Sequence, residues 1–323
     1  MTLSLTLQAS LLAATLLVPF GCRDDLAHER DILFVATRPG GTEDTYALHL
    51  ADLTTRRLIK ADSATSRSMP VWSPDTRSIA FVREFEDSTQ LYVLDTVGAT
   101  PRRLAPQLHF TYWPNWSPDG TSILFTEGET HGLDVYLIRA DGSGLRGVLH
   151  DPTADFRCPS WAPDERRFAV SAYRAGRSSI LEVDVTSNAT RTLLASDTSY
   201  VDCPAWSPSG DEIVFTIDPT PGDIWARWKR NPLEPWRADL AILDLKTGRV
   251  RTLVGGPGMS VYGHWSPDGR WIVFHSERHA APHIDSLPLR DRFHALEIYV
   301  IRSDGSDLRR LTTNDYYDGH PSW

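Results

Sequence analysis

The sequence lacks the features that would place it in several large classes of protein. Its 33 lysine and arginine residues are outnumbered by 42 aspartate and glutamate residues, which gives a net charge of −9. A general nucleic-acid binder needs a clustered basic surface that releases counterions from phosphates, so this balance argues against such a function. After residue 21 there is no second long hydrophobic run, so we expect no further membrane span.

Common catalytic and metal-binding motifs are also missing. The sequence contains no G-x-S-x-G nucleophile elbow, no H-E-x-x-H pair and no paired C-x-x-C motif. Because it ends at Trp323, we expect no hydrolase domain after the last repeat. No segment shows helical periodicity over the ten or more residues that a helix requires. We therefore expect an all-β protein without a cofactor, and favour a non-enzymatic role.

The amino-terminal segment has the properties of an export signal. Residues 1–21 carry no charged side chain and include the apolar run Leu11–Phe20, followed by Gly21 and Cys22. A small residue directly before a cysteine resembles a bacterial lipoprotein cleavage site, which would make Cys22 the lipidated first residue of the mature chain. A cleaved signal peptide or an uncleaved anchor with an incidental cysteine stays open. We expect an exported protein, with residues 22–30 as a short linker.

Tryptophan is abundant, with 11 residues, and its spacing reveals a repeat. Five segments share one pattern: PVWSPDTRSIAF (70–81), PNWSPDGTSILF (114–125), PSWAPDERRFAV (159–170), PAWSPSGDEIVF (204–215) and HWSPDGRWIVF (264–274). Their tryptophans are Trp72, Trp116, Trp161, Trp206 and Trp265, and Trp323 ends a sixth copy. The successive intervals are 44, 45, 45, 59 and 58 residues. Trp113 and Trp271 fall outside these positions and receive no role.

Each unit reads as four short antiparallel strands. Ser-Pro-Asp-Gly is typical of a type I turn, and it follows the tryptophan strand. The next run alternates large apolar residues, as in 79–81 and 123–125, and a third strand follows, as in 91–95 and 135–139. A fourth short strand ends in Arg-x-Leu. Units of about 45 residues with four strands are the size of β-propeller blades.

The ends of the repeat region complement each other. The first unit, from residue 32, has the second, third and fourth strands but no tryptophan strand, whereas the last unit has only the tryptophan strand. Together they complete a sixth blade and close the ring, which removes open sheet edges. We therefore predict a single six-bladed β-propeller over residues 31–323, and a monomer. An open β-solenoid is the alternative that this complementarity disfavours.

The repeated P-x-W-S-P-D-G, followed by I-x-F and I-Y-V-x-D, resembles the WD40-like repeat of TolB-type propellers. The resemblance covers residues 31–323 and implies the propeller fold. The same repeat occurs in periplasmic TolB, in propeller domains of prolyl-oligopeptidase-like enzymes and in propeller lyases. The amino-terminal α/β domain of TolB has no counterpart in the nine or so residues before Asp31. Functions that TolB performs through that domain are therefore not implied.

Two expanded loops are predicted on one face of the ring. They connect the second and third strands of consecutive units, over 217–239 and 276–295, and long loops on a rigid scaffold commonly carry function. The first holds an aromatic and basic cluster that suits a partner protein, a glycan or an anionic ligand. The alternative is a lid that packs on the blade. The candidate binding residues in this loop are Trp225, Trp228, Trp236, Arg227 and Arg230.

A second candidate site is the mouth of the central channel, formed by residues just before each tryptophan strand. A mixture of Arg, Asp and Tyr can hold a polar ligand or a peptide end, or it can form a self-satisfied hydrogen-bond network between blades. The second interpretation is favoured. The candidates here are Arg67, Tyr112, Arg157, Asp202, Tyr262 and Asp318.

Histidines cluster in the last two units, and they raise the rival hypothesis of a propeller enzyme. A metal-assisted polysaccharide lyase or hydrolase, resembling the oligogalacturonate-lyase type, would bind a divalent metal through such a cluster. His264, His275 and His320 are the candidates for this role. No spacing among them defines a ligand set, so surface and loop histidines are the favoured interpretation.

Cys158 and Cys203 occupy the same position in adjacent units, directly before Pro-x-Trp. In an exported protein the two residues could form a disulfide. Equivalent positions on a six-fold ring are expected near or beyond the ~7 Å Cα limit for a disulfide, so two buried free thiols are an equal alternative. In sum, the sequence predicts an exported, lipid-anchored propeller that binds a cell-envelope protein, a glycan or a small polar ligand.

Overall fold

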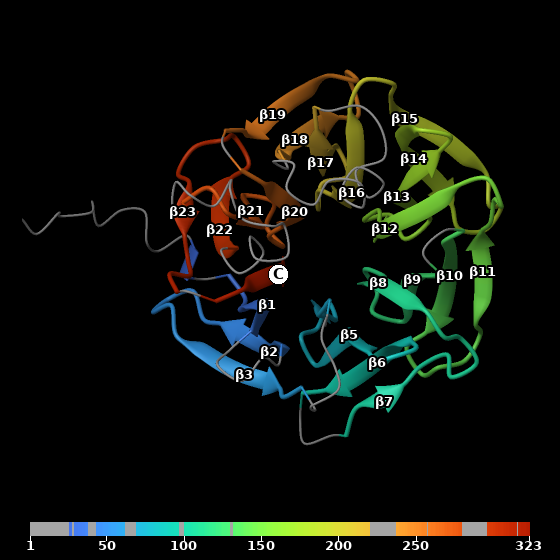
Figure 1. Ribbon diagram of the computed structural model, residues 1–323, viewed down its shortest axis with the longest axis horizontal. Coiled ribbons are helices and arrows are strands. Elements are labelled where there is room, and N and C mark those ends of the chain that lie inside the picture. Colours follow the sequence, from blue (N-terminus) through green and yellow to red (C-terminus); the bar gives the residue numbers. More distant parts are fainter. Residues whose placement is uncertain are drawn as a thin grey trace, which may run out of the picture.

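The computed structural model describes residues 26–27, 29–37, 43–61, 69–96, 100–129, 132–219, 237–256, 258–279, 296–314 and 316–323. In these ranges, 24 strands form six antiparallel sheets of four strands each. Figure 1 shows the sheets arranged around a central opening, so the predicted six-bladed all-β propeller is confirmed. No helix in the described ranges is long and apolar enough to span a membrane.

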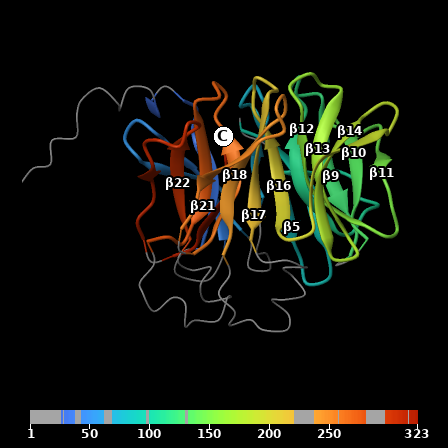
Figure 2. The ribbon, with the colours of Figure 1, turned by 90° about the horizontal axis from the view of Figure 1, so that it is seen from above.

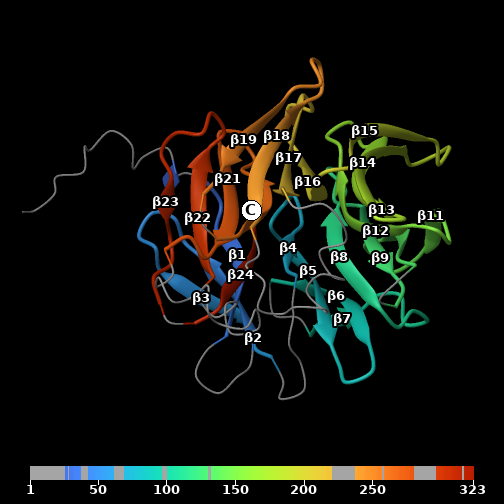
Figure 3. The same cartoon turned by 45° about the horizontal axis from the view of Figure 1, so that its top comes forward.

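Five blades consist of four consecutive strands, with the first at the ring axis and the fourth at the rim (Figures 1 and 3). Two of them are β4 (Val71–Trp72), β5 (Ser78–Glu84), β6 (Thr89–Asp95) and β7 (Arg102–Arg103), then β8 (Thr111–Trp116), β9 (Ser122–Glu127), β10 (Asp134–Arg139) and β11 (Arg146–Leu149). The next two are β12 (Asp155–Trp161), β13 (Arg167–Arg174), β14 (Arg177–Asp184) and β15 (Thr190–Ser196), then β16 (Tyr200–Trp206), β17 (Glu212–Asp218), β18 (Asp239–Asp244) and β19 (Val250–Val254). The fifth is β20 (Ser260–Trp265), β21 (Trp271–Ser276), β22 (Glu297–Arg302) and β23 (Arg309–Arg310).

The sixth blade joins the two ends of the ring, as the sequence predicts. It contains β24 (Asp318–Ser322), β1 (Ile32–Thr37), β2 (Glu43–Leu48) and β3 (Thr55–Ile59), in that order from the axis. The pairing of β24 with β1 is antiparallel, with Leu33 opposite Ser322 and Ala36 opposite Asp318. Because β24 pairs with β1, the inner side of β1 is not left as an open edge.

The repeated turn has the predicted geometry. In the turn between β8 and β9, the Gly120 N–H donates to the Ser117 carbonyl oxygen at 2.9 Å, and the Ser117 hydroxyl donates to Asp119 at 2.6 Å. The same hydroxyl oxygen accepts the Ser122 N–H at 2.9 Å. Gly120 has a φ of +71°, a conformation that glycine adopts without strain. Ser117, at the start of the turn, is therefore hydrogen-bonded both to its middle and to its end.

The repeated tryptophans link each blade to its neighbour. The Trp116 indole N–H donates to the Val71 carbonyl oxygen at 3.3 Å, and Trp265 bonds Ala205 in the same way at 3.1 Å. At the closing blade, Trp323 donates to His264 at 3.1 Å. Each acceptor directly precedes the tryptophan of the preceding blade. In these three blades a phenylalanine would fill the space but donate no hydrogen bond.

Aromatic pairs repeat inside the blades. The phenylalanine of the second strand lies opposite the tyrosine of the third, with ring centroids 5.6–5.9 Å apart. The four pairs are Phe34 with Tyr46, Phe81 with Tyr92, Phe125 with Tyr136, and Phe274 with Tyr299. These four phenylalanines are at most 1% exposed. Buried residues of adjacent blades also form common clusters, such as Phe34 and Leu48 with Val273 and Val300.

The two faces of the ring differ in their connections. Figure 2 shows the blades from the side, with the strands spanning the thickness of the disc. The Ser-Pro-Asp-Gly turns lie on one face, and the connections β17–β18 and β21–β22 leave from the other. Ile217 pairs with Asp239, and Ser276 pairs with Glu297, so each connection returns next to where it leaves. We call this second face the long-loop face.

Candidate functional site

In five of the six blades, a bulge in the innermost strand turns one residue towards the ring axis. In β12 the register shifts between Arg157 and Ser160, and in β16 between Asp202 and Ala205. The residue inside the bulge has a positive φ, a conformation that is uncommon outside glycine. The residues with this conformation are Trp113 (49°), Cys158 (51°), Cys203 (47°), Tyr262 (56°) and His320 (48°).

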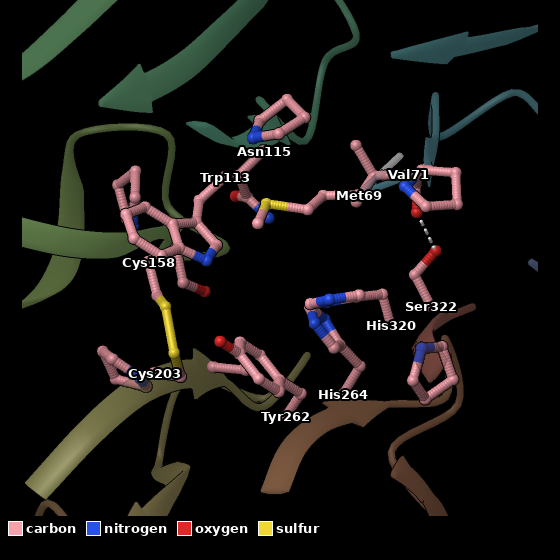
Figure 4. A pocket seen from close by; sticks show the side chains of 17 residues that line it. Met69, Val71, Trp113, Asn115, Cys158, Cys203, Tyr262, His264, His320 and Ser322 are labelled. Atoms are coloured by element: carbon pink, nitrogen blue, oxygen red, sulfur yellow. Dashed lines mark hydrogen bonds between the residues drawn. A yellow bond between two sulfur atoms is a disulfide. The ribbon is translucent and has the colours of Figure 1, made fainter. Parts of the chain in front are cut away.

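These bulged residues form the wall of a cavity at the ring axis (Figure 4). Its volume is about 550 Å³, including its open mouth. The lining also includes Met69, His264, prolines next to the bulged residues, and short side chains of the innermost strands, among them Asn115, Ser160 and Ser322. Figure 4 shows Trp113, Tyr262, His264 and His320 directed into the space. None of the lining residues is Asp, Glu, Lys or Arg; the cavity presents aromatic, imidazole, thioether, disulfide, amide and hydroxyl groups.

One hydrogen-bond donor in this wall has no partner among the described residues. The Trp113 indole nitrogen is buried and makes no hydrogen bond. An unpaired buried donor is costly, and such groups call for an explanation. A bound acceptor atom in the cavity would satisfy it. Trp113 was unassigned by the repeat pattern, and the structure gives it a place in the candidate site.

The structure joins Cys158 and Cys203 by a disulfide between adjacent blades. Their Cα atoms are 4.8 Å apart, so the expectation that the ring would hold them near or beyond 7 Å is wrong. That expectation treated the inner strands as regular. The bulge at each cysteine moves its backbone towards the axis, where the strands converge. The two residues are only 8% and 7% exposed, and both line the cavity.

Between the cavity and the long-loop face lies a hydrogen-bonded chain of polar residues. The Arg157 guanidinium donates to the Tyr200 hydroxyl oxygen at 3.1 Å, and this hydroxyl donates to the Asp202 carboxylate at 3.0 Å. Burial raises the pKa of Tyr200 well above its usual value, so the phenol stays protonated. The Arg157 guanidinium also lies 3.8 Å from Asp155. Two candidates, Arg157 and Asp202, are thus brought together as a network between blades.

The other described candidates from the channel mouth lie apart from this network. The Tyr112 ring contacts Trp113, with centroids 5.5 Å apart. Tyr262 stands one residue later in its strand than Arg157 and Asp202 do, because it is the bulged residue of β20. Asp318 is completely buried in the closing strand, where it accepts a hydrogen bond from Asn314 at 2.6 Å. The five described positions therefore do not form one ring.

The three histidines proposed as weak metal candidates gather beside Tyr262. The His275 and His320 ring centroids are 5.6 Å apart, and Tyr262 lies 5.3 Å and 5.0 Å from them. The His275 Nδ1 accepts the His320 backbone N–H at 3.2 Å, so neutral His275 carries its proton on Nε2. Burial lowers the pKa of His264 to about 4 and that of His275 well below its usual value. Both are therefore neutral at pH 7.

The histidines do not meet the geometry of a metal site in the described part of the chain. There, a single group of three His, Cys, Asp or Glu residues has ligand atoms within 4.8 Å of one another. It consists of Cys158, Asp202 and Cys203, and its sulfur atoms are bonded to each other. His264, His275 and His320 belong to no such group.

Several candidates lie outside the described residues. They are Cys22, Arg67, Trp225, Arg227, Trp228, Arg230 and Trp236. Among the residues that sequence reasoning missed, Met69 and Trp113 line the cavity, and Trp271 is fully buried beneath the guanidinium of Arg302 at 4.5 Å. The sequence does contain a signal for this site, namely the position three residues before each repeated tryptophan. Around the ring this position holds Met69, Trp113, Cys158, Cys203, Tyr262 and His320.

Comparisons with known proteins agree with this architecture. Residues 28–224 match the family model described as the TolB beta propeller domain. The chain is 30% identical over 206 residues to the uncharacterised protein Atu1656 of Agrobacterium fabrum, covering 61% of this chain and 65% of that protein. It is 33% identical over 92 residues to the Tol-Pal system protein TolB of Anaeromyxobacter dehalogenans, covering 28% and 21%. The chain thus matches less than two thirds of the length of these relatives.

Two solved structures have the same fold. TolB from Acinetobacter baumannii superposes with a TM-score of 0.70 at 19% identity, over 91% of this chain and 66% of that one. A protein described as putative TolB from Agrobacterium tumefaciens gives a TM-score of 0.63 at 17% identity, over 88% of both chains. At these identities the likeness concerns the propeller alone.

Proposed function

This chain belongs to the TolB β-propeller family, and on that premise we propose that it is a binding module of the cell envelope. It captures a protein partner at the long-loop face, where a segment of the partner reaches into the cavity at the ring axis. Its relative TolB is a protein of the Tol-Pal system, and this supports a protein rather than a glycan as the ligand.

The observation that carries the proposal is the chemistry of the cavity. Its wall offers aromatic and imidazole surfaces without a charged side chain, and it includes an unsatisfied indole donor from Trp113. Pockets with mostly apolar walls and a few directed polar groups are typical of binding sites. An inserted side chain with an apolar body and an acceptor atom would fill the space and accept the hydrogen bond.

The long-loop face adds a second element of recognition. The sequence between Asp218 and Asp239 contains Trp225, Trp228 and Trp236 with interleaved basic residues. Tryptophan and arginine are enriched at the energetic centres of protein interfaces. Because this loop and the one between Ser276 and Glu297 leave neighbouring blades on one face, a partner could contact both.

The amino-terminal segment bears on where in the cell the protein is located. We propose that residues 1–21 direct export and that Cys22 carries a lipid anchor, with the propeller following residue 30. A Cys22→Ala variant expressed in a bacterial host would then move from the membrane fraction to the soluble envelope fraction. Retention of the variant in membranes would show that the anchor is not at Cys22.

The binding function is tested by site-directed photocrosslinking in intact cells. A photoreactive residue at position 113 or 228 would form an adduct with one envelope protein, identified by mass spectrometry. The matched controls are positions 53 and 308, exposed leucines on the opposite face. Adducts of the same protein from both faces, or none from positions 113 and 228, would contradict a specific site on the long-loop face.

A further inference from the structure

Cys158, Cys203 and Asp202 have side chains of the kinds that bind metal ions, but the two sulfur atoms are bonded to each other in a disulfide. Two sulfur atoms and a carboxylate oxygen lie within 4.8 Å of one another. The two cysteines line the cavity, and Asp202 directly precedes Cys203 in β16. Thiolates and a carboxylate are ligands of Zn²⁺ and related thiophilic cations. The disulfide occupies both sulfurs, so the same residues can bind a metal only after reduction.

We propose that reduction of the Cys158–Cys203 disulfide converts this wall into a site for a thiophilic divalent cation. A dithiol reductant transfers two electrons to the disulfide and is itself oxidised to a disulfide, which leaves two cysteine thiols. The cation then displaces both thiol protons into solvent and forms two metal–sulfur bonds. The Asp202 carboxylate supplies the third ligand, and the cavity leaves a fourth position open to water.

The backbone holds the two cysteines in place independently of their bond. Each lies inside a bulge of an innermost strand, with φ of 51° and 47°, in the same place in neighbouring blades. The Cys203 N–H is also held at 2.8 Å by the Ser171 hydroxyl oxygen. Because these constraints belong to the strands, we infer that the thiols stay adjacent after reduction and face the cavity.

The surroundings of Asp202 orient its carboxylate as a ligand. One oxygen accepts the Cys203 N–H at 2.9 Å, and the other accepts the Tyr200 hydroxyl proton at 3.0 Å. Hydrogen bonds of this kind position metal ligands and tune their affinity. Binding of the cation displaces the two thiol protons.

Cadmium titration tests the site, because Cd²⁺ bound to thiolates gives a charge-transfer absorption in the near ultraviolet. The experiment uses the full chain with Cys22→Ser, so that Cys158 and Cys203 are the only cysteines. We expect one Cd²⁺ per reduced chain with this absorption, and none for the oxidised chain. Zinc should compete for the same site, and binding should release protons.

Two variants separate the site from incidental binding. Cys158→Ser with Cys203→Ser should fold, as judged by circular dichroism, and lose the absorption. Asp202→Asn should keep the stoichiometry and weaken the affinity by roughly tenfold, the effect expected when a ligand set is altered. The proposal fails if the oxidised chain or the double-serine variant binds equally, or if the reduced chain folds without binding. It also fails if reduction alone unfolds the propeller, because the site requires the strands. None of these outcomes depends on partner capture, so the proposed function is tested separately.

Discussion

At the scale of single residues, the repeated tryptophan acts through its indole nitrogen as well as its ring. Four of these residues donate to a main-chain oxygen of the preceding unit, whereas Trp161 and Trp206 have no partner for this nitrogen among the described residues. In those two blades the contact to the preceding blade uses the tryptophan backbone instead, since the Trp161 N–H donates to Asn115 and the Trp206 N–H to Ser160. The sequence repeat hides this difference.

We expect Trp265→Phe to cost more stability than Trp161→Phe. The two indoles are 9% and 8% exposed, so both substitutions remove a similar volume. Trp265→Phe also leaves the Ala205 carbonyl oxygen without its donor, a loss of about 1 kcal/mol. Trp161→Phe removes a donor that already lacks a partner. Urea unfolding of both variants measures the difference, and equal losses would mean that the indole bonds add nothing.

A second residue-scale prediction concerns the turn position where glycine recurs. Gly120, Gly210 and Gly269 have φ between +71° and +78°, and Glu165 stands at the same position with φ of +60°. A left-handed conformation costs a non-glycine residue about 1–2 kcal/mol, which exceeds the entropic cost of glycine. Glu165→Gly should therefore stabilise the protein by about 0.5 kcal/mol. The reciprocal control, Gly210→Glu, should destabilise it, and a loss of stability in Glu165→Gly would contradict the explanation.

At the scale of elements, regular strands could be predicted from the sequence, whereas their irregularities could not. Alternation of apolar residues located the strands, because burial on one face imposes a period of two. The bulges break that period without a distinctive residue type: Trp113, Cys158 and His320 adopt the same positive φ. This is why the sequence overestimates the distance between Cys158 and Cys203. The loop tryptophans remain predictions.

Buried histidines on two paired strands predict that the protein loses stability in acid. His264 on β20 and His275 on β21 have pKa values below the usual 6.5, with His264 at about 4. The His275 ring faces Tyr262 and His320. As the pH falls below 6.5, the unfolded chain binds protons that the folded chain excludes, so stability decreases until the folded-state pKa is reached.

Thermal or urea unfolding between pH 7 and 4 measures this effect. His264 keeps some contact with cavity solvent, so we expect its share of the loss to be roughly 1–3 kcal/mol. His264→Gln with His275→Gln should flatten the decline, and the glutamine oxygen at position 275 can still accept the His320 N–H. The control is His49→Gln, because hydrogen bonding to Asp31 raises the pKa of His49 and gives it the opposite dependence. An unchanged slope in the double variant would exclude these histidines as the cause.

At the scale of the whole molecule, closure of the ring depends on a strand from the far end of the chain. β24 pairs with β1, its Ser322 hydroxyl donates to the Pro70 carbonyl oxygen at 2.7 Å, and its Trp323 bonds His264. One short segment therefore contacts three blades. The sequence predicted this closure because the incomplete first and last units contain complementary strands.

Removing residues 316–323 should open the ring at a defined edge. The inner edge of β1 would then expose unpaired N–H and C=O groups, which promote edge-to-edge association. We therefore expect the truncated chain to elute as oligomers in size-exclusion chromatography.

A synthetic peptide of residues 314–323 added during refolding should restore the monomer, because it can pair with β1 and reinsert Trp323. The same peptide with Trp323→Ala and Ser322→Ala keeps the strand pairing but lacks both side-chain bonds, so it should rescue weakly. Equal rescue by the two peptides would show that β1 pairing alone closes the ring, and a truncated chain that stays monomeric and folded would show that closure is dispensable.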